Sequence, residues 1–328
     1  MKKVLVIGSA VCDVVMEVDH LPSRSEDINF YRQKMSLGGC AFNVCDCLRH
    51  FGVPFIPFLP VGRGMYGSFV RERLAARGIV SACPPPDGEN GCCYCLVEPD
   101  GERTFLCYRG AEYLFEEEWL SRLDESPDAE QIGCVYVCGL EMEEETGESI
   151  VRYLERHREY GVFFAPSARI CQIAPERMER MLELRPVLHL NEEEALRFTH
   201  CEAIREAGEA LSARTHNTVL VTRGRHGCLI FDPENGSCTQ VDAFPAEDGG
   251  DAIGAGDSHI GSVIALLQKG YAMRDAVRGA NRVAAAVAGV QGALLSDERF
   301  EKLSFRFTVC GGGTVNSNND GEMGRTFF

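Results

Sequence analysis

Seven short apolar runs bounded by Gly or Pro recur along the chain and constrain its fold more than any other feature. Their hydrophobic residues are consecutive and not alternating, which is typical of strands buried on both faces of a parallel sheet. The runs are residues 4–7, 55–59, 135–137, 162–165, 187–190, 219–221 and 229–231. Helical patterns lie between them, notably over 192–214 and 273–290. Because strands and helices alternate, the sequence predicts an α/β fold with a largely parallel sheet.

Two stretches depart from this alternation and indicate a small second sheet. Residues 14–36 and 91–113 are extended, hairpin-like segments, and Pro99-Asp100-Gly101 is a strong turn signal. After about Cys310 the chain becomes polar and rich in Gly and Asn. We therefore expect one domain over residues 1–310, with these two segments set apart from the main sheet, followed by a polar tail over 311–328.

The charge balance excludes two classes of partner. Lys and Arg number 33 and Asp and Glu number 49, so the formal net charge is −16. A nucleic-acid or anionic-membrane binder needs clustered cations. No apolar stretch approaches the roughly 20 residues that cross a bilayer. We expect no nucleic-acid partner and no membrane association.

Sixteen cysteines are the most unusual part of the composition. A disulfide framework belongs to small secreted chains, whereas this chain is long enough to bury a core without covalent links. The apolar run after Met1 is too short for a secretion signal and is better explained as a first strand. Cys92 and Cys95 form one C-x-x-C pair, but no second pair follows at zinc-finger spacing. We expect reduced thiols in a cytoplasmic protein, most of them packed as small hydrophobic residues, with Cys40 of separate interest in the site described below.

The common nucleotide-binding and hydrolase motifs are missing. There is no Gly-Lys dipeptide and thus no Walker A loop, and Gly8 lacks the further glycines of a dinucleotide fingerprint. Gly256-Asp257-Ser258 resembles the GDS of some esterases, but no histidine follows His259. An α/β oxidoreductase and a GDS hydrolase are therefore both disfavoured.

A glycine-rich turn with the sequence DAIGAGDS, at residues 251–258, opens an apolar helix. The backbone amides of Gly254, Ala255 and Gly256 would point at one spot, where the helix dipole favours an anion. Asp257 there would repel an anion, unless its task is to accept a proton from a hydroxyl that attacks a phosphoryl group held by these amides. The alternative is an ordinary Asp in the first turn of a helix.

Several segments resemble motifs of the ribokinase-like, PfkB carbohydrate kinase family, in family order from residue 8 to 281. The turn at 251–258 is similar to the family signature D-T-x-G-A-G-D. The other segments are Gly8-Ser9-Ala10-Val11-Cys12-Asp13, Gly38-Gly39-Cys40-Ala41-Phe42-Asn43, Asn191-Glu192-Glu193-Glu194, Thr222-Arg223-Gly224-Arg225-His226-Gly227 and the single position Asn281. The resemblance implies a three-layer α/β sandwich with a mostly parallel central sheet and a small β lid built from about 14–36 and 91–113.

The resemblance assigns sugar binding to the N-terminal motifs. Asp13 and Asn43, beside Gly39, would hydrogen-bond vicinal sugar hydroxyls, and Asp251 would also contact the substrate. Turn capping by Asp13 and N-capping of a helix over residues 44–50 by Asn43 are the alternative roles. Arg109 on the lid and Glu141 are expected to contact the substrate on resemblance alone. The alternative role for Arg109 is that of a surface cation.

The resemblance also implies Mg·ATP as the phosphoryl donor. The expected nucleotide-binding residues are Asn191, Thr222, Gly224, Gly227 and Asn281. Glu194 would hold Mg²⁺ through water. The alternative for Glu194 is a solvated helix face, and the alternative for Thr222 and Gly224 is a simple strand end and turn. Ala252 and His259 depart from the family pattern, which puts the monovalent-cation site of some members in doubt.

These observations predict an ATP-dependent kinase for a hydroxyl of a small sugar of the ribose, fructose or ketodeoxygluconate type. Aromatic residues on the lid, Phe30, Phe105 and Tyr108, keep a nucleoside kinase of the adenosine, inosine or pseudouridine type open as an alternative. A non-catalytic sugar sensor on the same fold is a second alternative. Exposed edges of the lid strands suggest a homodimer formed through the lid.

Overall fold

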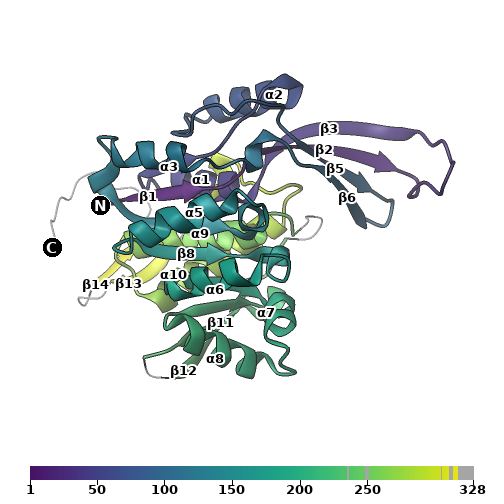
Figure 1. Cartoon of the computed structure of the whole chain (residues 1–328). Helices are drawn as coiled ribbons and strands as arrows, with labels where there is room; N and C mark the ends of the chain where they lie inside the picture. The colour runs from purple at the N-terminus through teal and green to yellow at the C-terminus, as the bar shows by residue number, and fades with distance from the viewer. Residues whose placement is uncertain (235, 248–249, 251, 304, 310–312, 317–328) are drawn as a thin grey trace.

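The computed structural model describes residues 1–234, 236–247, 250, 252–303, 305–309 and 313–316. It confirms the predicted α/β fold, which is built on an eight-stranded sheet of order β12-β11-β10-β9-β8-β7-β1-β4 (Figure 1). The strands are β1 (Lys3–Ile7), β4 (Phe55–Phe58), β7 (Ile132–Cys138), β8 (Gly161–Ala165), β9 (Val187–Asn191), β10 (Val219–Thr222), β11 (Cys228–Asp232) and β12 (Ser237–Val241). The six strands from β10 to β4 are parallel, and β11 and β12 extend that sheet antiparallel.

Each of the seven apolar runs forms a strand, and the burial of alternate residues explains why. In β1, Val4 and Val6 pack into one core cluster, and Leu5 and Ile7 pack into the other, on the opposite face of the sheet. Both faces of the strand are therefore buried away from water, so apolar residues are favoured at consecutive positions. The edge strand β12 has no such run because four of its five residues are partly or fully exposed.

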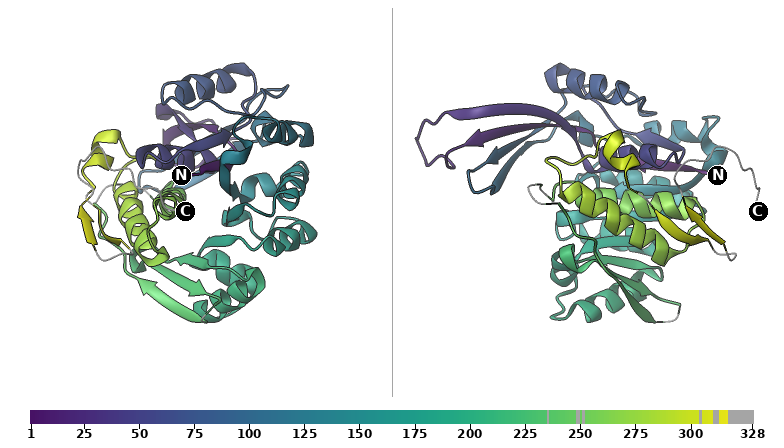
Figure 2. Two further views of the ribbon diagram at one scale, coloured as in Figure 1. Left: turned by 90° about the vertical axis from the view of Figure 1, so that its left-hand side faces the viewer. Right: turned by 180° about the vertical axis from the view of Figure 1, so that it is seen from behind.

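Helices cover both faces, which gives three layers (Figure 2). One core cluster joins the sheet to the helices α1 (Cys40–His50), α9 (Ala255–Gln268) and α10 (Met273–Ala288). The other joins it to α3 (Glu117–Asp124), α5 (Gly147–Arg156), α6 (Pro175–Glu183), α7 (Glu192–Thr199) and α8 (Ile204–Thr215). The helical pattern over 192–214 is thus two helices, because His200 ends α7 in a left-handed conformation with φ 58°. None of the helices in these described ranges is long and apolar enough to cross a membrane.

A separate four-stranded sheet, here called the lid, projects from the body (Figure 1). Its strands are β2 (Val11–Val18), β3 (Phe30–Gly38), β5 (Cys92–Val97) and β6 (Arg103–Tyr108), in the order β3-β2-β5-β6. Alternate residues on one face, among them Cys12, Val14 and Cys92, pack into the core cluster that contains α1. The two predicted extended segments thus form one sheet anchored along one face.

Shorter elements complete the chain. They are α2 (Gly64–Ala75), α4 (Gly139–Glu143), α11 (Asp297–Glu301) and the strands β13 (Arg306–Val309) and β14 (Gly313–Asn316). β13 and β14 pair as an antiparallel hairpin, so the segment expected as a polar tail from residue 311 includes one strand.

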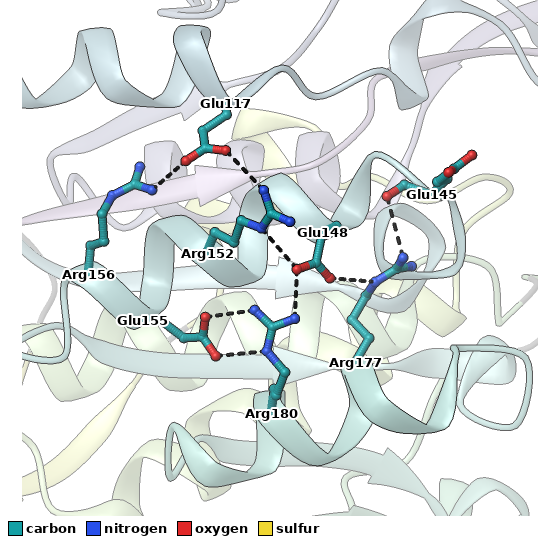
Figure 3. A network of polar contacts seen from close by, with 8 residues as sticks. All are labelled: Glu117, Glu145, Glu148, Arg152, Glu155, Arg156, Arg177 and Arg180. Carbon is teal, nitrogen blue, oxygen red and sulfur yellow. Dashed lines mark hydrogen bonds and ion pairs between the residues drawn. The ribbon is translucent and has the colours of Figure 1, made fainter.

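A network of ion pairs and hydrogen bonds joins α3, α5 and α6 on one outer face (Figure 3). Its members are Glu117, Glu145, Glu148, Arg152, Glu155, Arg156, Arg177 and Arg180. Arg180 binds both oxygens of Glu155, at 2.8 and 2.7 Å, and Oε1 of Glu148 at 2.6 Å. Arg177 donates to the carbonyl oxygens of Met142 and Glu144, at 2.6 and 2.7 Å. The network therefore holds the segment that follows Glu141, a predicted substrate contact.

Candidate active site

The carboxyl ends of the parallel strands bring the predicted motifs to one edge of the sheet. At the end of β1, the backbone N–H of Ser9 donates to Oε1 of Glu141 over 2.7 Å. A Cβ at Gly8 would lie 2.6 Å from Cβ of Ala41 and 3.0 Å from that same oxygen. Glycine at position 8 thus allows the first strand, α1 and α4 to meet around a fully buried carboxylate.

Asn43 and Asp257 join the predicted sugar-binding motif to the glycine-rich turn. They are 214 residues apart, and Nδ2 of Asn43 donates to Oδ2 of Asp257 over 2.8 Å. Helix α1 begins at Cys40 with Gly39 as its N-cap, so the alternative in which Asn43 caps a helix over 44–50 is wrong. The early start places Asn43 inside the helix, buried and directed at α9.

Burial raises the pKa of Asp257, and hydrogen bonds from Asn43 and from the Cys40 thiol lower it in part. A carboxylate held this way is a stronger proton acceptor than one in water, yet it keeps donors that favour its charged form. Cys40, which lies in the predicted sugar-binding turn, thus acts on the pKa of the predicted base.

Asp13 lies at the start of the lid and is partly buried. Burial raises the pKa of its carboxyl group to about 7. A Cβ at Gly38 would lie 1.9 Å from Oδ2 of Asp13, and a Cβ at Gly39 would lie 2.6 Å from the carbonyl oxygen of Ser9. The double glycine thus lets the turn pass close to both the predicted sugar ligand and the end of β1.

Buried polar atoms without a partner gather around this site. In the described ranges, Oδ1 of Asn43, Oε2 of Glu141 and the hydroxyl of Tyr136 have no hydrogen-bond partner. Burial raises the pKa of the Tyr136 hydroxyl well above its usual value, and nearby charges, those of Asp257 and Glu141 among them, raise it further. Buried polar groups are rarely left unpaired, so this cluster is suited to a ligand rich in hydrogen-bonding groups.

The N-terminus of α9 provides the proposed anion site. Gly254 is the N-cap with φ 72°, and a Cβ there would lie 2.6 Å from Cβ of Ala293. Gly256 is exposed, and a Cβ there would meet no atom within 4 Å. The amide of Ala255 already donates to the carbonyl of Ala252 over 3.2 Å, so the other first-turn amides are better placed to bind an anion. Asp251 lies outside the described residues.

Asn191 and Glu194, two residues of the predicted nucleotide and magnesium site, form a capping box at the start of α7. Oδ1 of Asn191 accepts from the Glu194 amide at 2.7 Å, and Oε2 of Glu194 accepts from the Asn191 amide at 2.9 Å. The alternative of a solvated helix face does not describe Glu194, which is 8% exposed. Asn191 pairs with Thr222 across β9 and β10, so these two motifs are adjacent.

The backbone of the loop after β10 reverses direction at Gly227. Its φ is 81°, and a Cβ there would lie 2.0 Å from the carbonyl oxygen of Val241. Gly224 has φ 52° and open space around it, so its surface is accessible. Gly227 therefore keeps this loop, which follows Thr222, against the end of β12.

Asn281 is held by protein groups. Its Nδ2 donates to the carbonyl oxygens of Val241 and Asp242, both at 3.0 Å, and its Oδ1 lies 3.0 Å from Nε2 of His259. Nδ1 of His259 lies 3.0 Å from Nε2 of His189 on β9. Because an amide oxygen only accepts, His259 donates through Nε2 and must accept from His189. A direct contact of Asn281 with adenine stays a prediction, and any such contact would compete with these bonds.

Arg109 lies just after β6 and forms ion pairs with Glu143, at 2.9 Å, and Glu144. The lid root is further tied by Glu112, a buried carboxylate that sequence reasoning missed. Its oxygens accept from the amides of Gly91, at 2.6 Å, and Gly110, at 3.0 Å, which flank the β5–β6 hairpin. Neither Glu112 nor the His189–His259 pair carries a local motif, although a polar residue at a buried position is a usable signal.

Comparisons with known proteins agree with this arrangement. The model of the pfkB family carbohydrate kinases matches residues 1–299. The "Uncharacterized sugar kinase YegV" of Escherichia coli (strain K12) is 34% identical over 306 residues, covering 92% of this chain and 93% of that protein.

Solved structures with lower identity share the fold. The ribokinase of Thermotoga maritima aligns with TM-score 0.77 and 21% identity, covering 92% of this chain and 98% of its own. The nucleoside kinase of Burkholderia thailandensis, solved in complex with inosine, aligns with TM-score 0.72 and 19% identity, covering 91% and 94%. The architecture is therefore the ribokinase-like fold expected from the motifs.

Proposed function

The chain belongs to the pfkB family of carbohydrate kinases and uses ATP as that family does, and on this premise we propose that it phosphorylates a hydroxyl of a small neutral sugar. The observation that carries the proposal is the 2.8 Å bond between Asn43 and Asp257. It joins a sugar-binding turn to a proton acceptor at the N-terminus of α9.

Each group around this bond has a role in the transfer. Asp13 and Asn43, with the close-packed Gly39, hold two sugar hydroxyls, and Glu141 offers its unpaired Oε2 to a third. Asp257 accepts the proton of the attacking hydroxyl. The amides of the glycine-rich turn, Gly256 above all, stabilise the charge of the phosphoryl group as it moves. Asp251 would add a further substrate contact.

The nucleotide lies along the Asn191, Thr222 and Gly224–Gly227 elements in this proposal. Glu194 fits a water-mediated magnesium contact, because the capping box engages Oε2 and no described residue bonds Oε1. When bound, Mg²⁺ neutralises charge on the phosphate oxygens. A monovalent-cation site would depend on the region around Asp251, and no role is assigned to one.

The charges around the pocket favour a neutral acceptor. Asp13, Glu141 and Asp257 are all carboxylates, and Arg109 is paired with Glu143 and Glu144. A sugar acid of the ketodeoxygluconate type would need a cation that is not already paired. We therefore rank ribose- and fructose-type sugars above sugar acids.

A nucleoside is the second candidate acceptor. Phe105 is 51% exposed on β6 and projects from the same lid face as Cys107 and Asp13, where it could stack on a base. Tyr108 pairs with Cys92 and projects from the opposite face. The nucleoside kinase from Burkholderia thailandensis has the same fold. The same exposed edge strand would support a homodimer through the lid.

A panel of acceptors tests the proposal. ADP release is measured with ribose, fructose, ketodeoxygluconate, adenosine, inosine and pseudouridine, each with a no-acceptor control. We expect the highest kcat/KM on a neutral sugar. A nucleoside as best acceptor would support the second candidate, and the absence of turnover on every member would favour a sugar sensor.

A further inference from the structure

One transverse row of lid side chains contains both the proposed sugar ligand and two thiols. Asp13 of β2 pairs with Ser36 of β3 and with Cys93 of β5, and Cys93 pairs with Cys107 of β6. Residues that pair directly across neighbouring strands project from the same face of a sheet. The row Ser36–Asp13–Cys93–Cys107 therefore lies on one face, opposite the face that packs on the core.

The two thiols are already in contact. Sγ of Cys93 and Sγ of Cys107 lie 3.3 Å apart. Directly opposed residues of an antiparallel pair have Cα atoms about 4.5–5.5 Å apart, which is within the range of about 4.4–6.8 Å that a disulfide spans. Closing an S–S bond of about 2.05 Å thus requires side-chain rotation and little movement of the strands.

Solvent reaches this pair. Cys107 is exposed and Cys93 is partly buried. Cys12 and Cys92 also pair directly, one row away, but they are 0% and 3% exposed and face the core. Cys171 is exposed and no other thiol contacts it among the described residues. Accessibility and a thiol partner therefore coincide at Cys93 and Cys107.

We propose that Cys93 and Cys107 form a dithiol site that reacts with low-molecular-weight disulfides to give a cross-strand disulfide, and that this bond weakens sugar binding at the neighbouring Asp13. The second part rests on the proposed function.

The reaction is a two-step thiol–disulfide exchange. The Cys107 thiolate attacks one sulfur of RSSR, which releases one thiolate and leaves a Cys107–S–SR mixed disulfide. The Cys93 thiol loses its proton to solvent, attacks the Cys107 sulfur and displaces the second thiolate. In sum, two cysteine thiols and RSSR give one protein disulfide and two RSH, so the protein pair is oxidised and RSSR is reduced.

The surroundings of Cys93 set the order of these steps. Burial raises the pKa of Cys93 well above its usual value, and the contact with Cys107 and the charge of Asp13 raise it further. Since the thiolate is the nucleophile, the exposed Cys107 reacts first and Cys93 resolves the mixed disulfide more slowly. A disulfide at this exposed position is accessible to thiol reductants, so it can be reduced again.

Mass mapping tests the site without any activity assay. The reduced full-length protein is incubated with oxidised glutathione, remaining thiols are alkylated, and peptides are mapped without reduction. We expect a Cys93–Cys107 link in the wild type and in the matched control Cys171→Ser. In Cys93→Ser, we expect Cys107 to be trapped as a glutathione mixed disulfide. A wild type that carries glutathione on Cys107 without the link, or that links a different pair, overturns the proposal.

A kinetic comparison tests the coupling to the sugar site. Oxidised wild type should show a sugar KM raised about fivefold, the factor expected for weakening one hydrogen bond, and a thiol reductant should restore it. The double variant Cys93→Ser/Cys107→Ser should keep the same KM with and without oxidised glutathione. A linked protein with unchanged KM refutes the coupling. If no sugar is turned over, the proposed function fails while the mapping still decides the dithiol site.

Discussion

Asn43→Ala deletes the side chain that binds both the proposed base and, in our account, the sugar. Nδ2 of Asn43 donates to Oδ2 of Asp257 over 2.8 Å. A hydrogen bond to a charged group contributes about 1.5–3 kcal/mol. It stabilises the ionised carboxylate, so its loss raises the pKa of Asp257 by about 1–2, since 1.36 kcal/mol corresponds to 1 in pKa. The Cys40 thiol still donates and water can enter, so we expect about 1.

The assay is the pH dependence of kcat at saturating sugar and ATP. Under these conditions the profile reports groups of the enzyme–substrate complex, in which Asp13 is held by the sugar. Asp257 accepts a proton only when ionised, so kcat falls as the pH drops through its pKa. In Asn43→Ala this acidic limb should move to higher pH by about 1.

Asn90→Ala is the matched control. Asn90 is another buried asparagine, and its Oδ1 accepts from the Gly62 amide at 2.9 Å, away from Asp257. The control should lose stability and keep the acidic limb in place. If Asn43→Ala loses kcat/KM while its acidic limb coincides with that of the wild type, Asn43 contacts the sugar alone and the reasoning about the base is wrong.

Three further predictions concern stability. Burial raises the pKa of Asp13 to about 7, so ionisation of Asp13 opposes folding increasingly as the pH rises from about 4 to 7. The variant Asp13→Asn removes this penalty, and it should therefore raise the melting temperature at pH 8 and raise it by less at pH 5. Arg180→Ala should lower the free energy of unfolding by about 1 kcal/mol at pH 7 in urea titrations, and Arg122→Ala, which breaks an exposed pair, by at most about 0.5 kcal/mol. The Arg180 effect should fade below about pH 4, because Arg180 lowers the pKa of Glu155 and that contribution is lost as the carboxylate protonates. His259→Phe should cost about 2–3 kcal/mol in the same titration, because two buried partners lose their hydrogen bonds, and an unchanged midpoint would contradict the histidine chain.

The parallel sheet was predictable because a strand that is buried on both faces has a recognisable local sequence pattern. Each central strand needs apolar residues on successive positions, and the sequence shows them. β12 has no such pattern, because an edge strand with exposed residues needs no apolar run. The break at His200 was also missed, since a left-handed residue other than Gly carries a weak signal.

The site was predictable where a motif sets backbone geometry. Gly39 and Gly254 have positive φ and sit against neighbouring backbone, so their motifs encode local shape. The partners of Arg109 and Asn281 come from other elements of the fold, and Glu143 and His259 are among them. No residue spacing in the sequence predicts those contacts.

The most direct test of the account is the turnover of Asp257→Asn on the best acceptor of the panel. Asparagine keeps the size of the side chain and cannot accept the proton of the attacking hydroxyl. We expect kcat to fall about 100-fold or more, while the Kd for the sugar, measured by calorimetry, stays within a few fold of wild type. A variant whose kcat is within twofold of wild type would show that Asp257 is not the base.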